Sequence, residues 1–251
     1  MRPVRNALSA LFVFALFVAC LVPAAGAAPA AKAPQFLRLE TEAGNILLVF
    51  YPGLAPNHVA NFKHLARTGF LDGTRFHRIV PGFVIQGGDP NSKDDDPRND
   101  GLGGPTVRDV LTEAEYQAVV AASKVLEGKG YNALTGEARL KAEFSRTAKH
   151  VRGTLSMARS QSVDSAGSQF FICVADTPAL DTQYTVFGHV VSGMEVADKI
   201  VSAEKNPAAG RDAPAVPVQI IKATVLEGTT GLSAAERGAW DALPASLKDV
   251  H

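Results

Sequence analysis

Two short segments of the chain place one arginine and two glutamines among aromatic and apolar residues in alternation. The first covers residues 76–89 and reads FHRIVPGFVIQGGD, and the second covers residues 168–172 and reads SQFFI. Arg78 supplies a permanently charged guanidinium with several donors in a fixed fork, while Gln86 and Gln169 supply the amides. These side chains suit hydrogen bonding to a bound group rather than covalent attack. By itself, however, the alternation predicts only strands of a core.

The motifs of common hydrolytic and nucleotide-binding sites are missing from the sequence. No two histidines stand four residues apart with a glutamate between them, as a zinc-protease helix requires. The acidic run 94–96 lacks the spaced ligands of a calcium loop. Residues 101–104 lack the lysine and the hydroxyl residue of a phosphate-binding loop. No Gly-x-Ser-x-Gly elbow occurs, and Cys173 has no evident base. We therefore expect neither a metal nor a cofactor.

The composition is typical of a globular, β-rich protein. The chain has 251 residues, of which 46% are hydrophobic, enough for one domain of about 200 residues with additions. Lys and Arg together number 25 and so do Asp and Glu, so there is no basic excess to bind a phosphate backbone. Twenty-two glycines and 15 prolines favour many turns. We expect a monomer that binds no nucleic acid.

The first residues resemble an export signal. Arg2 and Arg5 precede an apolar run, residues 7–22, which is followed by Pro23 and the small residues 25–27. This order is typical of a secretory signal peptide, and the run is short for a membrane span of about 20 residues. We expect cleavage near residue 27 and a periplasmic or secreted protein without a membrane span. Two alternatives stay open, an uncleaved N-terminal anchor and lipid attachment at Cys20.

Alternating and apolar runs predict about eight short strands and two helices. Pro56 opens a helix that ends at Gly69, and a second helix covers about Met194 to Ser202. Strands do not alternate with helices one by one, which favours a mainly β fold, a closed eight-stranded antiparallel barrel capped by two helices. The predicted strands are residues 36–40, 46–51, 75–80, 83–87, 154–158, 169–174, 185–191 and 218–227.

One segment interrupts this β pattern. Residues 106–139 form an insertion with a predicted helix from Thr112 to Gly128, which begins at the capping box Thr112–Glu115. We expect its Tyr116 and Val120 face to pack on the barrel. The resulting domain boundaries are 1–27 for the signal peptide, 28–35 for a tether, 36–227 for the barrel domain with its insertion, and 228–251 for a weakly patterned tail.

The two opening segments and several later ones resemble the cyclophilin family of peptidyl-prolyl cis-trans isomerases. The later blocks are residues 155–159 (LSMAR), 165–172 (SAGSQFFI) and 186–190 (VFGHV), and they stand in the family's order. The resemblance covers roughly Leu37 to Leu226 apart from the insertion, and it is closest to bacterial-like, exported members. It implies a barrel with a peptide groove on one outer face.

The resemblance also implies which residues form the site. Carried over by motif, the catalytic residues are Arg78, Phe83 and Gln86. The substrate-binding residues are Val84, Ala158, Arg159, Gln169, Phe171, Leu180 and Tyr184. Animal members often have tryptophan where Ala179 stands and histidine where Tyr184 stands, so tight cyclosporin binding is not expected here.

The activity implied is rotation of the X-Pro bond in unfolded or extended polypeptides, which would assist the folding of exported proteins. Arg78 would donate a hydrogen bond to the prolyl nitrogen as it becomes pyramidal. His77 is expected to be structural, because no proton is transferred. Two alternatives remain: a barrel that grips proline-containing segments without turnover, and a scaffold that displays the insertion.

Overall fold

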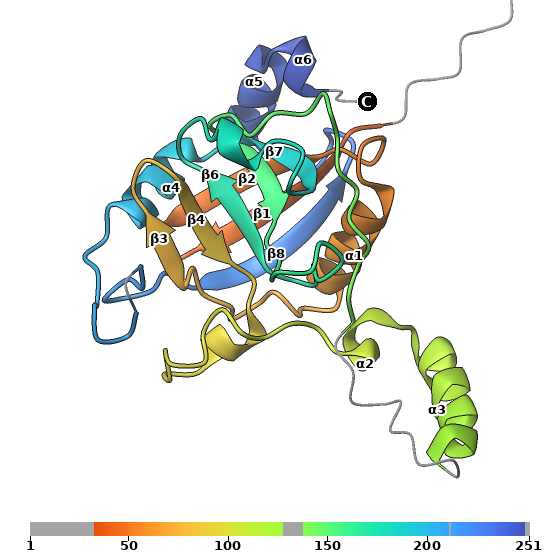
Figure 1. The fold of residues 1–251 in the computed structure, drawn as a ribbon. Coiled ribbons are helices and arrows are strands. Elements are labelled where there is room, and N and C mark those ends of the chain that lie inside the picture. Colours follow the sequence, from red (N-terminus) through yellow and green to blue (C-terminus); the bar gives the residue numbers. More distant parts are fainter. Residues whose placement is uncertain (1–32, 128–137, 211, 249–251) are drawn as a thin grey trace, which may run out of the picture. The chain divides into compact units, whose positions relative to one another are not determined.

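Eight antiparallel strands curl around one apolar interior (Figure 1). This computed structural model describes residues 33–127, 138–210 and 212–248. The predicted signal peptide and most of the tether lie outside the described residues. The strands are β1 (Gln35–Thr41), β2 (Gly44–Phe50), β3 (Arg78–Val80), β4 (Val84–Gly87), β5 (Thr154–Met157), β6 (Phe170–Cys173), β7 (Val186–Ser192) and β8 (Ile220–Glu227). The helical elements are α1 (Pro56–Arg67), η1 (Pro90–Lys93), α2 (Val107–Val110), α3 (Glu113–Glu127), η2 (Pro178–Leu180), α4 (Met194–Val201), α5 (Ala234–Ala242) and α6 (Ala245–Lys248).

The strand order is β3-β4-β6-β5-β7-β2-β1-β8, so β3 and β8 stand at the two ends of the sheet. The predicted mainly β, eight-stranded antiparallel fold is confirmed, but the ring of strand ladders is open between these ends. The segment that precedes β3 in the sequence, residues 73–76, spans this gap instead. Gly73 N donates to Ile220 O and Ile220 N to Thr74 O, each at 2.8 Å, and Phe76 N donates to Val218 O at 2.9 Å. The barrel is therefore completed by a bridge rather than by a ladder.

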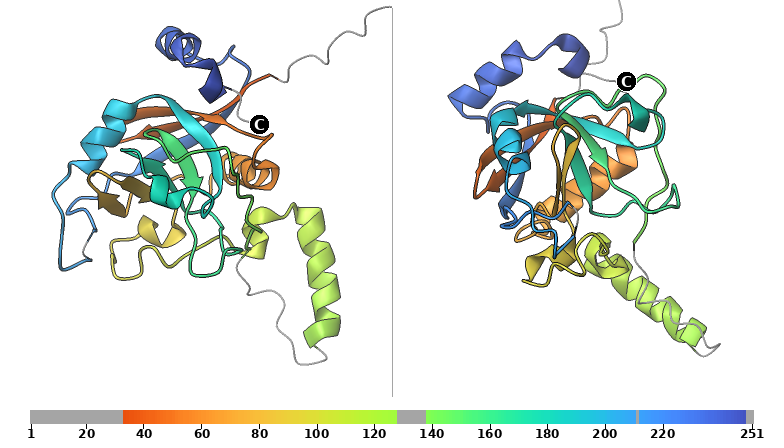
Figure 2. Two further views of the ribbon diagram at one scale, coloured as in Figure 1. Left: turned by 45° about the horizontal axis from the view of Figure 1, so that its top comes forward. Right: turned by 60° about the vertical axis from the view of Figure 1, so that its left-hand side comes forward.

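The interior follows from the alternation of each strand. Every second side chain of a strand points inward. In the interior, an aromatic cluster with ring centroids 5.0–6.5 Å apart is formed by Phe50, Phe62, Phe170 and Phe187. Helix α1 contributes Phe62 from a buried face that recurs at helical spacing. Helix α4 buries Val196, Ala197, Ile200 and Val201 in the same way. These two helices are the predicted caps: both bury residues in the same interior, and they lie at opposite ends of the barrel (Figures 1 and 2).

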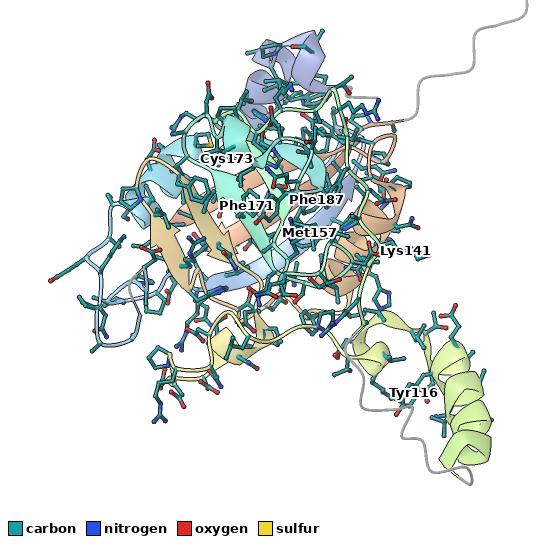
Figure 3. All side chains as sticks on the ribbon, in the orientation of Figure 1. Tyr116, Lys141, Met157, Phe171, Cys173 and Phe187 are labelled. Atoms are coloured by element: carbon teal, nitrogen blue, oxygen red, sulfur yellow. The ribbon has the colours of Figure 1, made fainter. Side chains whose placement is uncertain are left out.

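In its described residues the insertion forms the helices α2 and α3, and the longer α3 does not pack on the barrel as expected. Helix α3 extends away from the sheet, and Tyr116 lies on it (Figures 2 and 3). The Tyr116 ring instead carries the guanidinium of Arg108, 4.2 Å from its centroid. The predicted capping box is present, because Thr112 N donates to Glu115 Oε2 at 2.9 Å and Glu115 N donates to Thr112 Oγ1 at 3.4 Å. None of the described side chains of α3 is buried.

The tail forms a second apolar layer on the outside of the barrel. Trp240 of α5 stands edge-on to Phe36 of β1, with ring centroids 5.0 Å apart. Arg38 forms a two-point ion pair with Glu236, Nε to Oε1 at 2.7 Å and Nη2 to Oε2 at 2.6 Å. Ser233 caps α5 in a capping box with Glu236. The tail is thus an ordered part of the fold, where the sequence pattern predicted little structure.

Candidate functional site

The site starts at a tight turn that sets β3 against β4. Pro81 and Gly82 form its two central residues, and Gly82 has φ of 71°, a value that glycine adopts without strain. Phe83 N donates to Val80 O at 3.0 Å and closes the turn. The antiparallel register then places Arg78 directly opposite Gln86. The segment 76–89 therefore presents its charged group and its amide side by side.

Strand β6 extends this surface. Its register pairs Gln86 with Phe171 and Val84 with Cys173. Because side chains alternate between the two faces, these four point to the outer face, while Ile85, Phe170 and Ile172 fill the interior. Figure 3 labels Phe171 and Cys173 on β6. The outer face of β4 and β6 thus carries a small apolar patch of its own.

A hollow of about 150 Å³ lies over this patch. Nine of the ten site residues expected from the sequence line it: Arg78, Phe83, Val84, Gln86, Ala158, Arg159, Phe171, Leu180 and Tyr184. Val84 and Phe171 are buried and form the floor, whereas Arg78 is 39% exposed. The hollow therefore combines an apolar floor with a guanidinium at its edge.

The tenth residue, Gln169, joins the site through hydrogen bonds. Arg78 Nη1 donates to Gln86 Oε1 at 3.3 Å, Gln86 Nε2 donates to Gln169 Oε1 at 3.0 Å, and Gln169 Nε2 donates to the carbonyl of Gly103 at 2.8 Å. This series of hydrogen bonds fixes the orientation of the Gln86 amide, so that its oxygen and not its nitrogen faces Arg78. The two glutamines thus act on the position of the guanidinium instead of only satisfying backbone groups.

One wall of the hollow is aromatic. The Tyr184 ring stands edge-on to Phe171, with centroids 5.7 Å apart, and the Arg159 guanidinium lies 4.6 Å from the centroid of Tyr184. Arg159 Nε also donates to the carbonyl of Gln183 at 3.1 Å. The Arg159 side chain therefore holds the loop that carries Tyr184, and its role goes beyond that of its backbone.

Two buried histidines lie close to the site. His150, which the sequence analysis did not include, stacks on Phe171 with centroids 6.0 Å apart. Its Nδ1 lies 3.2 Å from Asp181 Oδ1, and its Nε2 lies 3.0 Å from Ser156 Oγ. Burial lowers the pKa of His150, and burial also lowers the pKa of His77. Neutral, buried imidazoles agree with the structural role expected for His77.

The loop between Leu180 and Tyr184 is held in an unusual conformation. Thr182 has φ of 63°, in the left-handed region that β-branched residues seldom adopt. His150 N donates to Asp181 Oδ1 at 2.8 Å, and Thr177 N donates to the carbonyl of His150 at 2.7 Å. His150 thus ties down the loop that supplies one wall of the hollow.

A second hollow, of about 260 Å³, adjoins the first and shares Gln86, Ala158 and Arg159 with it. The far end of the insertion reaches this hollow, because Ala138 and Arg139 line it. Ala138 N donates to Pro105 O at 2.7 Å, so the two ends of the insertion meet here. The two hollows therefore share part of their lining, and the insertion begins and ends at the edge of the second one.

Comparisons with known proteins show similarity over most of the chain. Residues 36–225 match the profile of the family described as "Cyclophilin type peptidyl-prolyl cis-trans isomerase/CLD". A probable peptidyl-prolyl cis-trans isomerase of Brucella abortus is 39% identical over 226 residues, which are 88% of this chain and 96% of the relative. Peptidyl-prolyl cis-trans isomerase A of Dickeya dadantii is 35% identical over 204 residues, 79% of this chain and 88% of the relative.

The fold has solved counterparts as well. A cyclophilin-type isomerase of Cryptosporidium parvum, crystallised in the presence of the dipeptide Ala-Pro, superposes with a TM-score of 0.58 at 24% identity. The superposition covers 76% of this chain and 98% of that chain. This likeness supports the barrel architecture alone.

Proposed function

The chain belongs to the cyclophilin-type peptidyl-prolyl cis-trans isomerase family, and from this premise we propose that the hollow beside Arg78 is where the X-Pro bond rotates. The substrates of such an enzyme are proline-containing polypeptides. The observation that supports this assignment is that nine residues from distant parts of the sequence line one hollow, with Arg78 at its edge.

The reaction is slow for a physical reason that the hollow can address. Amide resonance sets a barrier of about 18–20 kcal/mol, and uncatalysed exchange at X-Pro takes tens to hundreds of seconds. In the twisted state, resonance is lost and the prolyl nitrogen becomes pyramidal, so that it can accept a hydrogen bond. No covalent bond forms or breaks. A donor placed at that nitrogen therefore lowers the barrier by binding the twisted state better than the planar one.

Arg78 is the donor in this proposal. Its guanidinium is charged at all physiological pH values and offers five N–H groups in a plane. Gln86 Oε1 holds Nη1, and the remaining N–H groups are directed by that contact. The floor made by Val84 and Phe171 and the walls from Phe83 and Leu180 would hold the proline ring by apolar contact. Lowering the barrier by about 7 kcal/mol would give roughly a 10⁵-fold acceleration.

The test is isomerisation of a tetrapeptide with a central X-Pro bond, compared between the wild type and Arg78→Ala. A lower turnover in Arg78→Ala than in the wild type supports the assignment. A barrel that binds proline-containing segments without turnover would give line broadening or chemical-shift changes of the peptide in NMR spectra, with no acceleration of cis-trans exchange. That result would support the alternative binding function.

We further propose that the enzyme is exported and assists the folding of exported proteins. The support is the sequence of the first 27 residues, which lie outside the described residues. In the part of the chain that the structure describes, no helix is long and apolar enough to span a membrane. N-terminal sequencing of the mature protein tests this: a start near residue 28 supports cleavage, and a lipid on Cys20 supports the anchored alternative.

We also propose a monomer that acts without nucleic acid. The support for the second point is that basic and acidic residues are equal in number, so there is no basic excess to bind a phosphate backbone. The elution volume in size-exclusion chromatography coupled to light scattering tests the first point. A dimer mass at micromolar concentration would overturn it.

A further inference from the structure

A carboxylate lies near the terminal nitrogen of Arg78 that does not donate to Gln86. Asp212 Oδ2 is 3.6 Å from Arg78 Nη2, whereas Gln86 Oε1 accepts from Nη1. The two terminal nitrogens of the guanidinium thus have different neighbours on two different elements. An arginine side chain has many rotamers, and contacts at two separate nitrogens restrict the plane of its fork more than one contact does.

Asp212 is placed by backbone bonds and not by its contact with Arg78. Its carbonyl accepts from Ile79 N at 2.8 Å, which fixes it against the outer edge of β3. The loop that carries it is closed by two further bonds, Asn206 N to Ala213 O at 2.8 Å and Ala215 N to Glu204 O at 2.7 Å. The position of the carboxylate is therefore expected to survive a change of its side-chain chemistry.

A lysine balances the charge of this carboxylate. Lys205 Nζ lies 3.0 Å from Asp212 Oδ1, the oxygen that does not face Arg78. An Arg–Asp pair alone would have no net charge, which would weaken the electrostatic stabilisation of electron density at a substrate nitrogen. With Lys205, the group of three carries one positive charge next to the hollow.

From these contacts we propose that Asp212 is a positioning residue for Arg78 and that Lys205 preserves the positive charge at the site. The inference rests on the proposed function, in which Arg78 acts on the prolyl nitrogen. Asp212 fixes the orientation of the guanidinium that suits the twisted state, so its effect falls on turnover. It lies outside the hollow that takes the proline ring, so it contributes little to substrate affinity.

The experiment measures kcat and KM on an X-Pro tetrapeptide for Asp212→Asn, Asp212→Glu and Lys205→Met. We expect Asp212→Asn to lower kcat about 5-fold with KM unchanged, Asp212→Glu to recover at least half of the loss, and Lys205→Met to lower kcat 2- to 3-fold. The matched control is Asp198→Asn, because Asp198 forms a similar surface pair with Arg152 through Oδ2 and Nη2 at 2.7 Å. It should leave both constants unchanged.

The double variant Arg78→Ala/Asp212→Asn separates this inference from the proposed function. If Asp212 acts through Arg78, the second change has no further effect once the guanidinium is gone. Two results would overturn the role of Asp212. In one, Asp212→Asn lowers kcat by the same factor in the Arg78→Ala background as in the wild type. In the other, Asp212→Asn alone has a normal kcat. Full activity of Arg78→Ala would instead overturn the proposed role of Arg78, and with it this inference. A thermal midpoint measured for each variant shows whether the loop still folds.

Discussion

Arg78 and Gln86 face each other across the β3–β4 ladder, and Nη1 of the arginine donates to Oε1 of the glutamine at 3.3 Å. This contact depends on backbone register, because a slip of one residue would turn one of the two side chains to the other face of the sheet and separate them. The turn at Pro81–Gly82 sets that register. The geometry of the site is therefore determined by a turn whose two central residues do not line the hollow.

Replacing Arg78 with alanine should lower turnover by about 100-fold or more, on the order of 3 kcal/mol of transition-state stabilisation. Arg78→Lys should recover little, since one ammonium cannot reproduce the planar fork held by Gln86. The measurement is proline isomerisation in a tetrapeptide, with circular dichroism as the folding control. A folded Arg78→Ala protein with near-normal turnover would show that the guanidinium is not the catalytic donor.

The site residues of the β3–β4 hairpin and of β6 were predicted from motifs that resemble a known family. Alternation alone predicted only strands of a core, and the structure shows that Val84, Gln86 and Phe171 lie on the outer face. Their motifs are short and continuous along the chain. Arg78 belongs to the same hairpin and follows from it.

Contacts between distant segments could not be predicted in this way. Arg38 and Glu236 are 198 residues apart, and nothing near either one indicates the other. The tail nevertheless carried a usable local signal, because Ser233 and Glu236 have the spacing of a capping box. Closure of the barrel depends on a bridge between Arg75 and Gln219, which period-two patterns do not reveal.

Excising the insertion should leave the barrel folded. Pro105 and Ala138 are already joined by a hydrogen bond of 2.7 Å, so two or three glycines can replace residues 106–137. The loss includes the contact of His64 Nε2 with the Asp109 carbonyl at 3.0 Å, worth about 1 kcal/mol. We expect near-normal turnover on a tetrapeptide and altered turnover among unfolded protein substrates.

Two assays check the excision. Thermal unfolding shows whether the barrel survives, and failure to fold would mean that the insertion belongs to the core. Turnover on several unfolded proteins tests selectivity, and rates equal to the wild type on all of them would contradict a role for the insertion in substrate choice.

Thr182→Gly should raise the free energy of unfolding by about 0.5–1 kcal/mol. The φ of 63° costs a residue with a Cβ about 1–2 kcal/mol, and glycine removes this cost. The greater freedom of glycine in the unfolded chain offsets about 0.5–1 kcal/mol of the stabilisation. Chemical denaturation measures the difference. Thr182→Ala is the control, since it keeps a Cβ in the same conformation and should gain less. Equal stability of all three proteins would show that the turn is unstrained.

Cys173 should not react with thiol reagents in the folded protein. The side chain is fully buried, and burial raises the pKa of its thiol to about 11, so almost no thiolate is present at pH 8. Labelling of a Cys20→Ser protein should follow global unfolding and speed up with denaturant. Rapid stoichiometric labelling without denaturant would show that the outer face of β6 opens locally.

The ion pair between Arg38 and Glu236 should make the attachment of the tail depend on pH. The hydrogen bond from Arg38 lowers the pKa of Glu236 to about 2 in the folded protein, against an ordinary value of 4.5. A lowered folded-state pKa stabilises the protein above the unfolded value, and this stability is lost as the pH falls from about 4.5 to about 2. With solvent screening, we expect Glu236→Gln to lower the free energy of unfolding by about 1–2 kcal/mol at pH 7.

Thermal unfolding should show this difference shrinking toward pH 2. The control is Asp241→Asn, which changes an exposed carboxylate on the same helix and should show little difference from the wild type at any pH. A gap between wild type and Glu236→Gln that stays constant down to pH 2 would mean that packing of Trp240 on Phe36, and not the ion pair, attaches the tail.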